Sequence, residues 1–268
     1  MTFPGATLSV GFAPAAMPRI EQAIHTDSEG LEASEVRIPV SDGELPAYRA
    51  RPIKADRFPI VLVVQEIFGV HEYIRDVCRR LAKQGYLAIA PELYARQADL
   101  STLTDIQEIL TKVVPRVSDA QVMADLDAAA EYAAKDGGDP ARTGITGFCW
   151  GGRIAWLYAA HNPRLRGAVA WYGRLAGTAG PLHPRHPLDQ AAELHCPVLG
   201  LYGGKDEAIP LLTIEQMRAA AAAAGRAVEI IVYPEAGHAF HADYRPSYHQ
   251  ASAEDGWRRL TQFFAAHL

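Results

Sequence analysis

Short apolar runs alternate with amphipathic segments along most of the chain. The run 59–64 (PIVLVV) is continuous and rich in β-branched residues, as in a strand that is buried on both faces. The other runs have the length of strands; they are 86–90, 143–148, 167–172, 197–202 and 228–233. Between them, apolar residues recur at helical spacing in 72–84, 118–136, 150–161, 211–224 and 254–268. Two earlier strand-like runs, 35–40 and 44–50, flank Asp42-Gly43, a dipeptide typical of a tight hairpin turn. This alternation predicts an α/β fold, with a mostly parallel sheet covered by helices on both faces.

The pattern contains no linker that would divide the chain. We expect one α/β domain over residues 33–268, preceded by an extended N-terminal arm, 1–32. The arm lacks a basic start and contains Pro4, Pro14 and Pro18, which argues against a signal peptide. Residues 174–189 are rich in Gly, Pro and His and predict an irregular excursion that forms a partial lid.

Composition and charge narrow the classes of function. Hydrophobic residues make up 49% and charged residues 21% of the 268 residues, as in ordinary globular proteins. The net charge of -5 is spread over interspersed acids and bases, so the concentrated basic patch of a nucleic-acid surface is missing. No apolar stretch approaches the ~20 residues that span a bilayer. We therefore expect a cytoplasmic monomer or dimer that acts on a small molecule, with no nucleic-acid or membrane partner.

The three cysteines do not form a disulfide or zinc pattern. Their number is odd and none is spaced as CxxC. Cys78 falls in an amphipathic helical segment and Cys196 begins an apolar strand, so both are predicted to be small core residues. Cys149 differs because it lies between a strand and a helix.

The residues around Cys149 have the form of a nucleophile elbow. The predicted strand 143–148 runs into Gly147-Phe148-Cys149-Trp150-Gly151-Gly152 and then into a helix. Small residues are needed on both sides because the backbone of the nucleophile is strained and the helix packs close to the strand. A helix N-terminus also favours a thiolate and an oxyanion. A glycine-rich turn around a structural cysteine is the alternative.

Two further polar residues follow strands. Asp206 comes after strand 197–202, and His238 comes after strand 228–233. Ligand sites in open α/β sheets gather at the carboxyl ends of strands. Taken singly, Asp206 is typical of a turn and His238 of a packed or surface residue. The chain order nucleophile, acid, histidine is that of α/β-hydrolases, and it predicts a Cys-His-Asp triad.

Four motifs resemble the dienelactone hydrolase family, and the resemblance extends from about residue 33 to the C-terminus. The motifs read QEIFG (65–69), GFCWGG, GGKDEAIP and PEAGHAFH. The resemblance implies a carboxymethylenebutenolidase-like α/β-hydrolase that opens small lactones or esters without a cofactor. It implies Cys149 as nucleophile, His238 as general base and acid, and Asp206 as the group that orients His238. It also implies an oxyanion hole formed by the backbone N–H groups of Ile67 and Trp150.

Glu66 is the second residue that is characteristic of the family. A carboxylate beside a permanently charged thiolate would be repelled. In the family, this glutamate keeps the resting cysteine neutral until substrate binding releases it. The resemblance thus implies a switch at Glu66, whereas the alternative is a surface acid at the end of a strand.

The residues expected to bind the substrate differ from those of the family. The best-known members carry two carboxylate-binding arginines where this chain has Ala242 and, near Gln107, no arginine. Cations that could substitute are Lys112, Arg116 and Arg245. We take as candidate substrate-binding residues Phe68, Arg96, Arg116 and Phe240. The alternative for Arg96, which lies in a family segment, is a structural ion pair.

Other chemistries find less support. A metal site is conceivable at His183, His186, His238 and His241, but no HExxH or equivalent spacing is present, and we expect no metal. No GxGxxG or Walker pattern surrounds Gly203-Gly204. Two alternatives to a lactone or ester hydrolase stay open: a thioesterase or acyltransferase on the same fold, and a catalytically idle binding protein. A degraded triad would favour the idle protein.

Overall fold

The computed structural model describes the chain except residues 2, 4–7, 9–10 and 54–56. Pro4, one of the three prolines that argue against a signal peptide, lies outside the described residues. Among the described residues, eight strands form one sheet in the order β1-β2-β4-β3-β5-β6-β7-β8. They are β1 (Leu31–Val40), β2 (Gly43–Pro52), β3 (Phe58–Val64), β4 (Leu87–Pro91), β5 (Gly138–Phe148), β6 (Gly167–Trp171), β7 (Val198–Gly203) and β8 (Val228–Tyr233). β1, β2 and β4 pair antiparallel, and every pair from β4 to β8 is parallel.

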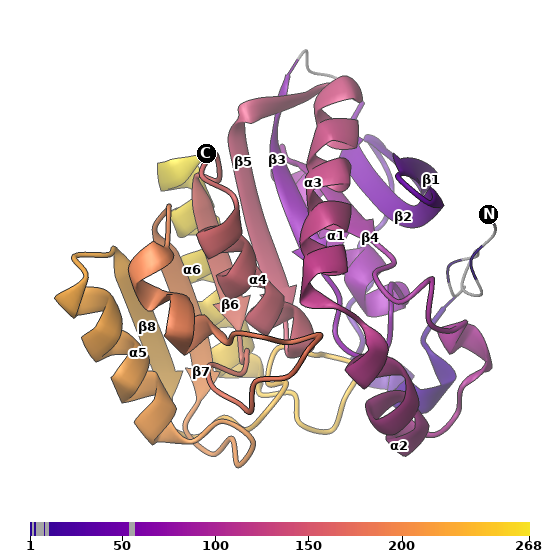
Figure 1. The fold of residues 1–268 in the computed structure, drawn as a ribbon. Helices are drawn as coiled ribbons and strands as arrows, with labels where there is room; N and C mark the ends of the chain where they lie inside the picture. Colours follow the sequence, from indigo (N-terminus) through magenta and orange to yellow (C-terminus); the bar gives the residue numbers. More distant parts are fainter. Residues whose placement is uncertain (2, 4–7, 9–10, 54–56) are drawn as a thin grey trace.

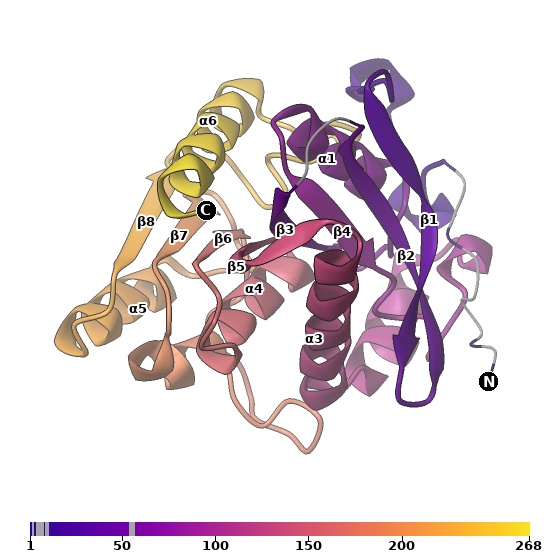
Figure 2. The ribbon, with the colours of Figure 1, turned by 90° about the horizontal axis from the view of Figure 1, so that it is seen from above.

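Helices cover both faces of the sheet. The longer ones are α1 (Glu72–Lys83), α3 (Asp119–Lys135), α4 (Trp150–His161), α5 (Leu211–Ala223) and α6 (Gln250–His267). The view along the sheet shows α1 and α6 on one face and α3, α4 and α5 on the other (Figures 1 and 2). All residues of β4, β6 and β7 are buried, because these strands have a helix layer on each side. The predicted α/β fold with a mostly parallel sheet is confirmed.

The hairpin at the start of the domain differs by one residue from the prediction. Val40 pairs with Gly43, so the two loop residues are Ser41 and Asp42 rather than Asp42 and Gly43. Asp42 is held at the tip because its carboxylate accepts two hydrogen bonds of 2.7 Å from Arg96. A partner 54 residues away therefore contributes to the turn.

Short helical turns were not predicted from the sequence. α2 (Ile106–Glu108) continues into a π-helical turn at Ile109–Val113 and a 3-10 turn at Val114–Arg116, and another 3-10 helix covers Pro187–Glu193. These pieces are too short to show a helical period, so the hydrophobic pattern could not reveal them.

The described part of the N-terminal arm packs against the domain. The carbonyl of Gly11 accepts a 2.8 Å hydrogen bond from the amide of Glu72 at the start of α1, and the amide of Arg19 donates to the carbonyl of Tyr244 at 2.7 Å. The ring of Phe12 lies 5.3 Å from that of Tyr244. The arm thus rests on the loop that follows β8. Within the described residues, no helix combines the length and apolarity needed to cross a membrane.

Candidate active site

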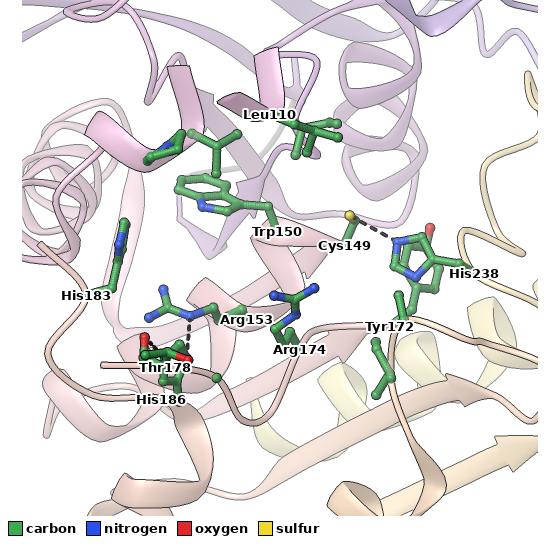
Figure 3. A pocket seen from close by; sticks show the side chains of 16 residues that line it. Leu110, Cys149, Trp150, Arg153, Tyr172, Arg174, Thr178, His183, His186 and His238 are labelled. Carbon is green, nitrogen blue, oxygen red and sulfur yellow. Dashed lines mark hydrogen bonds between the residues drawn. The ribbon is translucent and has the colours of Figure 1, made fainter. Parts of the chain in front are cut away.

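The carboxyl ends of β5, β7 and β8 bring three predicted site residues into contact. The Sγ of Cys149 lies 3.1 Å from Nε2 of His238 (Figure 3). Nδ1 of His238 lies 2.7 Å from Oδ2 of Asp206. The three residues are 32 or more positions apart in the chain. They meet because neighbouring parallel strands end at the same edge of the sheet.

Cys149 has the strained backbone expected of a nucleophile elbow. Its φ of 56° and ψ of -113° place it in a conformation that L-residues rarely adopt. A Cβ at Gly147 would meet the carbonyl of Gly151, and a Cβ at Gly151 would meet the carbonyls of Val64 and Gln65. The absent side chains let α4 start directly against the end of β3. The amide of Cys149 donates to the carbonyl of Trp171 at 3.0 Å, which holds the elbow on β6.

His238 has one hydrogen-bonding partner on each ring nitrogen. Burial disfavours its charged form, but the hydrogen bonds to Asp206 and Cys149 outweigh this effect and raise the pKa of His238 to about 10. Asp206 is buried, and its Oδ1 also accepts a 2.9 Å hydrogen bond from the amide of Ala208. At neutral pH, the imidazolium is therefore the favoured form of His238, held in one orientation beside the sulfur.

The two residues predicted to form the oxyanion hole line the same cavity as the sulfur. Ile67, in the loop after β3, and Trp150, the first residue of α4, both line the cavity that contains Cys149. In the part of the chain that the structure describes, neither amide donates to a protein acceptor. Paired N–H groups of this kind stabilise an oxyanion where the charge develops.

A buried glutamate holds the loop that carries Ile67. Oε2 of Glu92 accepts a 2.7 Å hydrogen bond from the amide of Val70. Burial raises the pKa of Glu92 to about 7, against the smaller effect of the backbone donors. Gly69, with a φ of 75°, leaves no room for a side chain, because a Cβ there would meet the Glu92 carboxylate. Glu92 was not among the predicted site residues.

Glu66 is fully buried and is bonded to a tyrosine rather than to the cysteine. The hydroxyl of Tyr244 donates to its Oε2 at 2.6 Å, and Oε1 has no partner among the described residues. Burial raises the pKa of Glu66, and the positive charge of Arg245 is the largest opposing influence. Arg245, whose guanidinium lies 5.3 Å from the ring of Phe68, is thus the one of the three proposed cations that acts on Glu66.

The other two cations are engaged elsewhere. Lys112 pairs with Glu108 at 2.9 Å, one helical turn away. The Nε of Arg116 donates to the carbonyl of Lys112. Both side chains lie on the exposed side of the 106–116 segment.

The sulfur opens into a cavity of about 510 Å³ (Figure 3). This volume is typical of small-molecule sites. One wall is the excursion after β6, which contributes Arg174, Gly177, Thr178, His183 and His186. The facing wall is apolar and includes Leu110, Val114, Pro115 and Trp150. The excursion expected to form a partial lid thus forms part of the cavity wall.

None of the four candidate substrate-binding residues lines this cavity. Phe68 and Phe240 are buried in the core. Arg96 forms structural ion pairs instead, because its guanidinium pairs with Asp125 and with Asp42 in the hairpin. Arg116 lies on the outer surface of its turn. Arg174, which does line the cavity, was not among the predicted site residues, although its position just after β6 was a signal.

The histidines considered for a metal site do not converge. Nε2 of His183 lies 2.9 Å from the carbonyl of Val117, and Nε2 of His186 lies 3.2 Å from that of Thr178. Nδ1 of His241 lies 2.6 Å from the hydroxyl of Tyr73. A separate trio, His25, Glu72 and Asp76, has ligand atoms within 4.8 Å of one another, but Arg79 pairs with both carboxylates.

Known proteins resemble this chain over most of its length. The model of the dienelactone hydrolase family matches residues 45–268. A protein of Methylorubrum extorquens named "putative carboxymethylenebutenolidase" is 62% identical over 260 residues, covering 96% of this chain and 89% of that protein. A protein of the same name from Escherichia coli K12 is 56% identical, covering 96% of each. A crystal structure from Klebsiella pneumoniae, described as a "putative dienelactone hydrolase", has a TM-score of 0.87 and 59% identity, covering 88% of this chain and 99% of that one.

Proposed function

Because this chain belongs to the dienelactone hydrolase family and is a hydrolase of that kind, we propose that it opens small lactones or esters through a thiol acyl-enzyme on Cys149. The observation that carries the proposal is the continuous contact from Cys149 through His238 to Asp206, at 3.1 Å and 2.7 Å. A cysteine at a helix N-terminus beside an imidazolium is an activated nucleophile.

Acylation uses the groups around the sulfur in turn. The thiolate of Cys149 attacks the carbonyl carbon, and the carbonyl oxygen becomes an oxyanion that accepts hydrogen bonds from the amides of Ile67 and Trp150. When the C–O bond breaks, the imidazolium of His238 gives its proton to the departing alkoxide oxygen. In a lactone this oxygen stays attached to the acyl group, so the product of this step is a ring-opened thioester.

Deacylation returns the enzyme to its starting state. Neutral His238 takes a proton from water while the water oxygen attacks the thioester carbon, and the same two amides hold the new oxyanion. Collapse expels the thiolate and releases a carboxylic acid. Asp206 keeps Nε2 directed at the reacting atoms in both steps, because its carboxylate accepts a hydrogen bond from the N–H at Nδ1. No cofactor takes part in either step.

The test of this proposal is detection of the acyl-enzyme. p-Nitrophenyl acetate and a carboxylate-bearing dienelactone are incubated with the wild-type protein, quenched in acid and analysed by peptide mass spectrometry. We expect p-nitrophenolate release and an acyl group on the peptide that contains Cys149, and none on Cys78 or Cys196, which are buried. Turnover of both substrates with no acylated cysteine would contradict the thiol mechanism.

We further propose that Glu66 controls the charge state of Cys149. Glu66→Gln removes a buried negative charge near His238 while keeping an acceptor for the Tyr244 hydroxyl. Because a like charge disfavours a thiolate, alkylation of Cys149 by iodoacetamide at neutral pH should become about 3- to 10-fold faster, roughly 1 kcal/mol. The acid limb of the pH–rate profile should move to lower pH.

The matched control for this variant is Glu207→Gln. It removes the same charge from an exposed side chain beside Asp206 in the sequence. An alkylation rate and a pH–rate profile that are both unchanged in Glu66→Gln would rule out a switch at this residue.

A further inference from the structure

Glu92 connects two loops at the edge of the sheet where Cys149 lies. It directly follows β4, and its amide donates to the carbonyl of Pro46 in β2 at 2.8 Å. Its carboxylate is buried between the loops. Oε2 accepts a 2.7 Å hydrogen bond from the amide of Val70 in the loop after β3, and Oε1 accepts one of 3.4 Å from the amide of Tyr94 in its own loop. Each carboxylate oxygen thus binds one of the two loops.

Gln65 makes the reverse connection between the same loops. It is fully buried directly after β3, and its Oε1 accepts a 3.3 Å hydrogen bond from the amide of Leu93, the residue after Glu92. Gly69 lets the loop approach the carboxylate closely, since a Cβ there would lie 2.6 Å from Oε2 of Glu92. Side chains from both loops therefore tie them together.

The backbone of the loop after β3 has no other hydrogen-bonded support among the described residues. Residues 66–70 lie outside the strands and helices, and none of them forms a hydrogen bond with another backbone group there. Ile67, one of the two proposed oxyanion donors, lies three residues before Val70. The bond from Val70 to Glu92 is therefore the hydrogen bond that fixes the backbone carrying the amide of Ile67.

The charge of Glu92 is not balanced by a cation. Its carboxylate forms no ion pair with any residue that the structure describes. Burying a carboxylate without a cation lowers stability, so a neutral residue of the same shape would suit the fold at least as well. The carboxylate differs from the neutral amide of glutamine because it has two acceptor oxygens and no donor. That property is what two N–H groups from different loops require.

Tyr94 extends the effect of Glu92 to the second proposed oxyanion donor. Tyr94 is fully buried, and its ring lies 4.8 Å from the ring of Trp150. The residue whose amide binds Oε1 of Glu92 thus packs on the first residue of α4. Glu92 contacts the loop that carries one donor and the turn that packs against the other.

We propose that Glu92 is a positioning residue for the oxyanion hole, whose carboxylate fixes the amide of Ile67 relative to that of Trp150 by binding both neighbouring loops. The inference rests on the proposed function and adds a residue that does not touch the substrate. An oxyanion hole depends on donors that are fixed before the reaction, so a displacement of about 1 Å is enough to slow acyl transfer.

The test compares two reactions of the same sulfur in the wild type and in Glu92→Gln. Acylation by p-nitrophenyl acetate forms an oxyanion, whereas alkylation by iodoacetamide forms an S–C bond, expels iodide and needs no oxyanion hole. Glutamine would place an NH₂ donor against one of the two amides. We expect single-turnover acylation and kcat to fall about 10- to 100-fold with KM little changed, and alkylation of Cys149 to stay within about twofold.

Two further variants reach the same contact by other changes. Glu92→Asp keeps two acceptor oxygens and should recover part of the acylation rate. Gly69→Ala places a Cβ against the Glu92 carboxylate from the other loop, so it should slow acylation and spare alkylation in the same way. These two variants carry the test if Glu92→Gln does not fold, as judged by circular dichroism.

The matched control is Glu72→Gln, close to the same loop in the sequence. Glu72 pairs with Arg79 and makes no hydrogen bond to residues 65–70, so its loss should lower the Tm and leave the ratio of acylation to alkylation unchanged. In the Glu92 variants, rates of acylation and alkylation that fall in parallel, or that both stay at the wild-type level, would overturn the positioning role and leave the proposed function standing. A wild type that is not acylated on Cys149 would overturn both.

Discussion

Cys149→Ala is expected to lower kcat/KM for p-nitrophenyl acetate by about 10⁴-fold or more, while the fold stays intact. In the proposed mechanism, the variant removes the atom that forms the acyl bond, and only the amides of Ile67 and Trp150 are left to assist attack by water. Cys149 is half-buried at the start of α4, and alanine adopts its backbone conformation with no larger clash. We therefore expect its circular dichroism spectrum and Tm to be close to those of the wild type.

Two controls separate loss of the nucleophile from loss of structure. Cys78→Ala removes a thiol from the buried face of α1; it should reduce stability, since it leaves a cavity, and keep turnover within about threefold. Cys149→Ser keeps a nucleophile with a hydroxyl in place of the thiol and should retain a trace of activity. A Cys149→Ala protein with a substantial fraction of wild-type turnover would refute the assignment of the nucleophile.

Asp206→Asn should lower kcat by about 10³- to 10⁴-fold at neutral pH. The amide NH₂ of asparagine would face Nδ1 of His238 and favour the tautomer with its proton on Nε2, which cannot accept a proton from the reacting atoms. The carboxylate is also one of the groups that raise the pKa of His238 to about 10, so that pKa should fall in the variant. Thiolate absorbance near 240 nm, followed against pH, would report the changed ion pair.

The pH dependence of the Tm provides a second, independent test of Asp206→Asn. The folded pKa of His238, about 10, exceeds its ordinary value of 6.5. Its charged form therefore contributes stability that is fully present below pH 6.5 and is lost as the pH rises toward 10. The Tm difference between wild type and Asp206→Asn should be larger at pH 6.5 than near pH 10, whereas Glu207→Gln should show no such trend. An equal difference at both pH values would argue against a charged His238.

The sequence predicted the sheet and the meeting of Cys149, His238 and Asp206, because both depend on local signals. The apolar runs of β3, β4, β6 and β7 are buried on both faces of the sheet, and the boundaries of α4 and β8 agree with the predicted ones. Cys149, Asp206 and His238 each follow a strand directly. Parallel strands end at one edge of the sheet, so their side chains meet without any knowledge of long-range packing.

Only the tertiary structure decided which cations are free for a ligand. The free energy of a charged side chain depends on partners that are distant in sequence, and no local pattern reveals them. Arg96 was a candidate for the site, yet Asp42, 54 residues away, and Asp125, 29 residues away, neutralise it. Arg174 was not a candidate, yet its side chain lines the cavity and has no hydrogen bond or ion pair with any described residue.

The environment of Glu66 was likewise invisible in the sequence. The motif predicted an acid close to the elbow, but the hydroxyl that binds it belongs to Tyr244, 178 residues along the chain. The N-terminal arm packs on that same tyrosine. Local geometry places Cys149, Asp206 and His238, because each of them directly follows a strand. Their charge states and the selectivity of the cavity depend on burial and on pairing between distant segments, which only the folded chain determines.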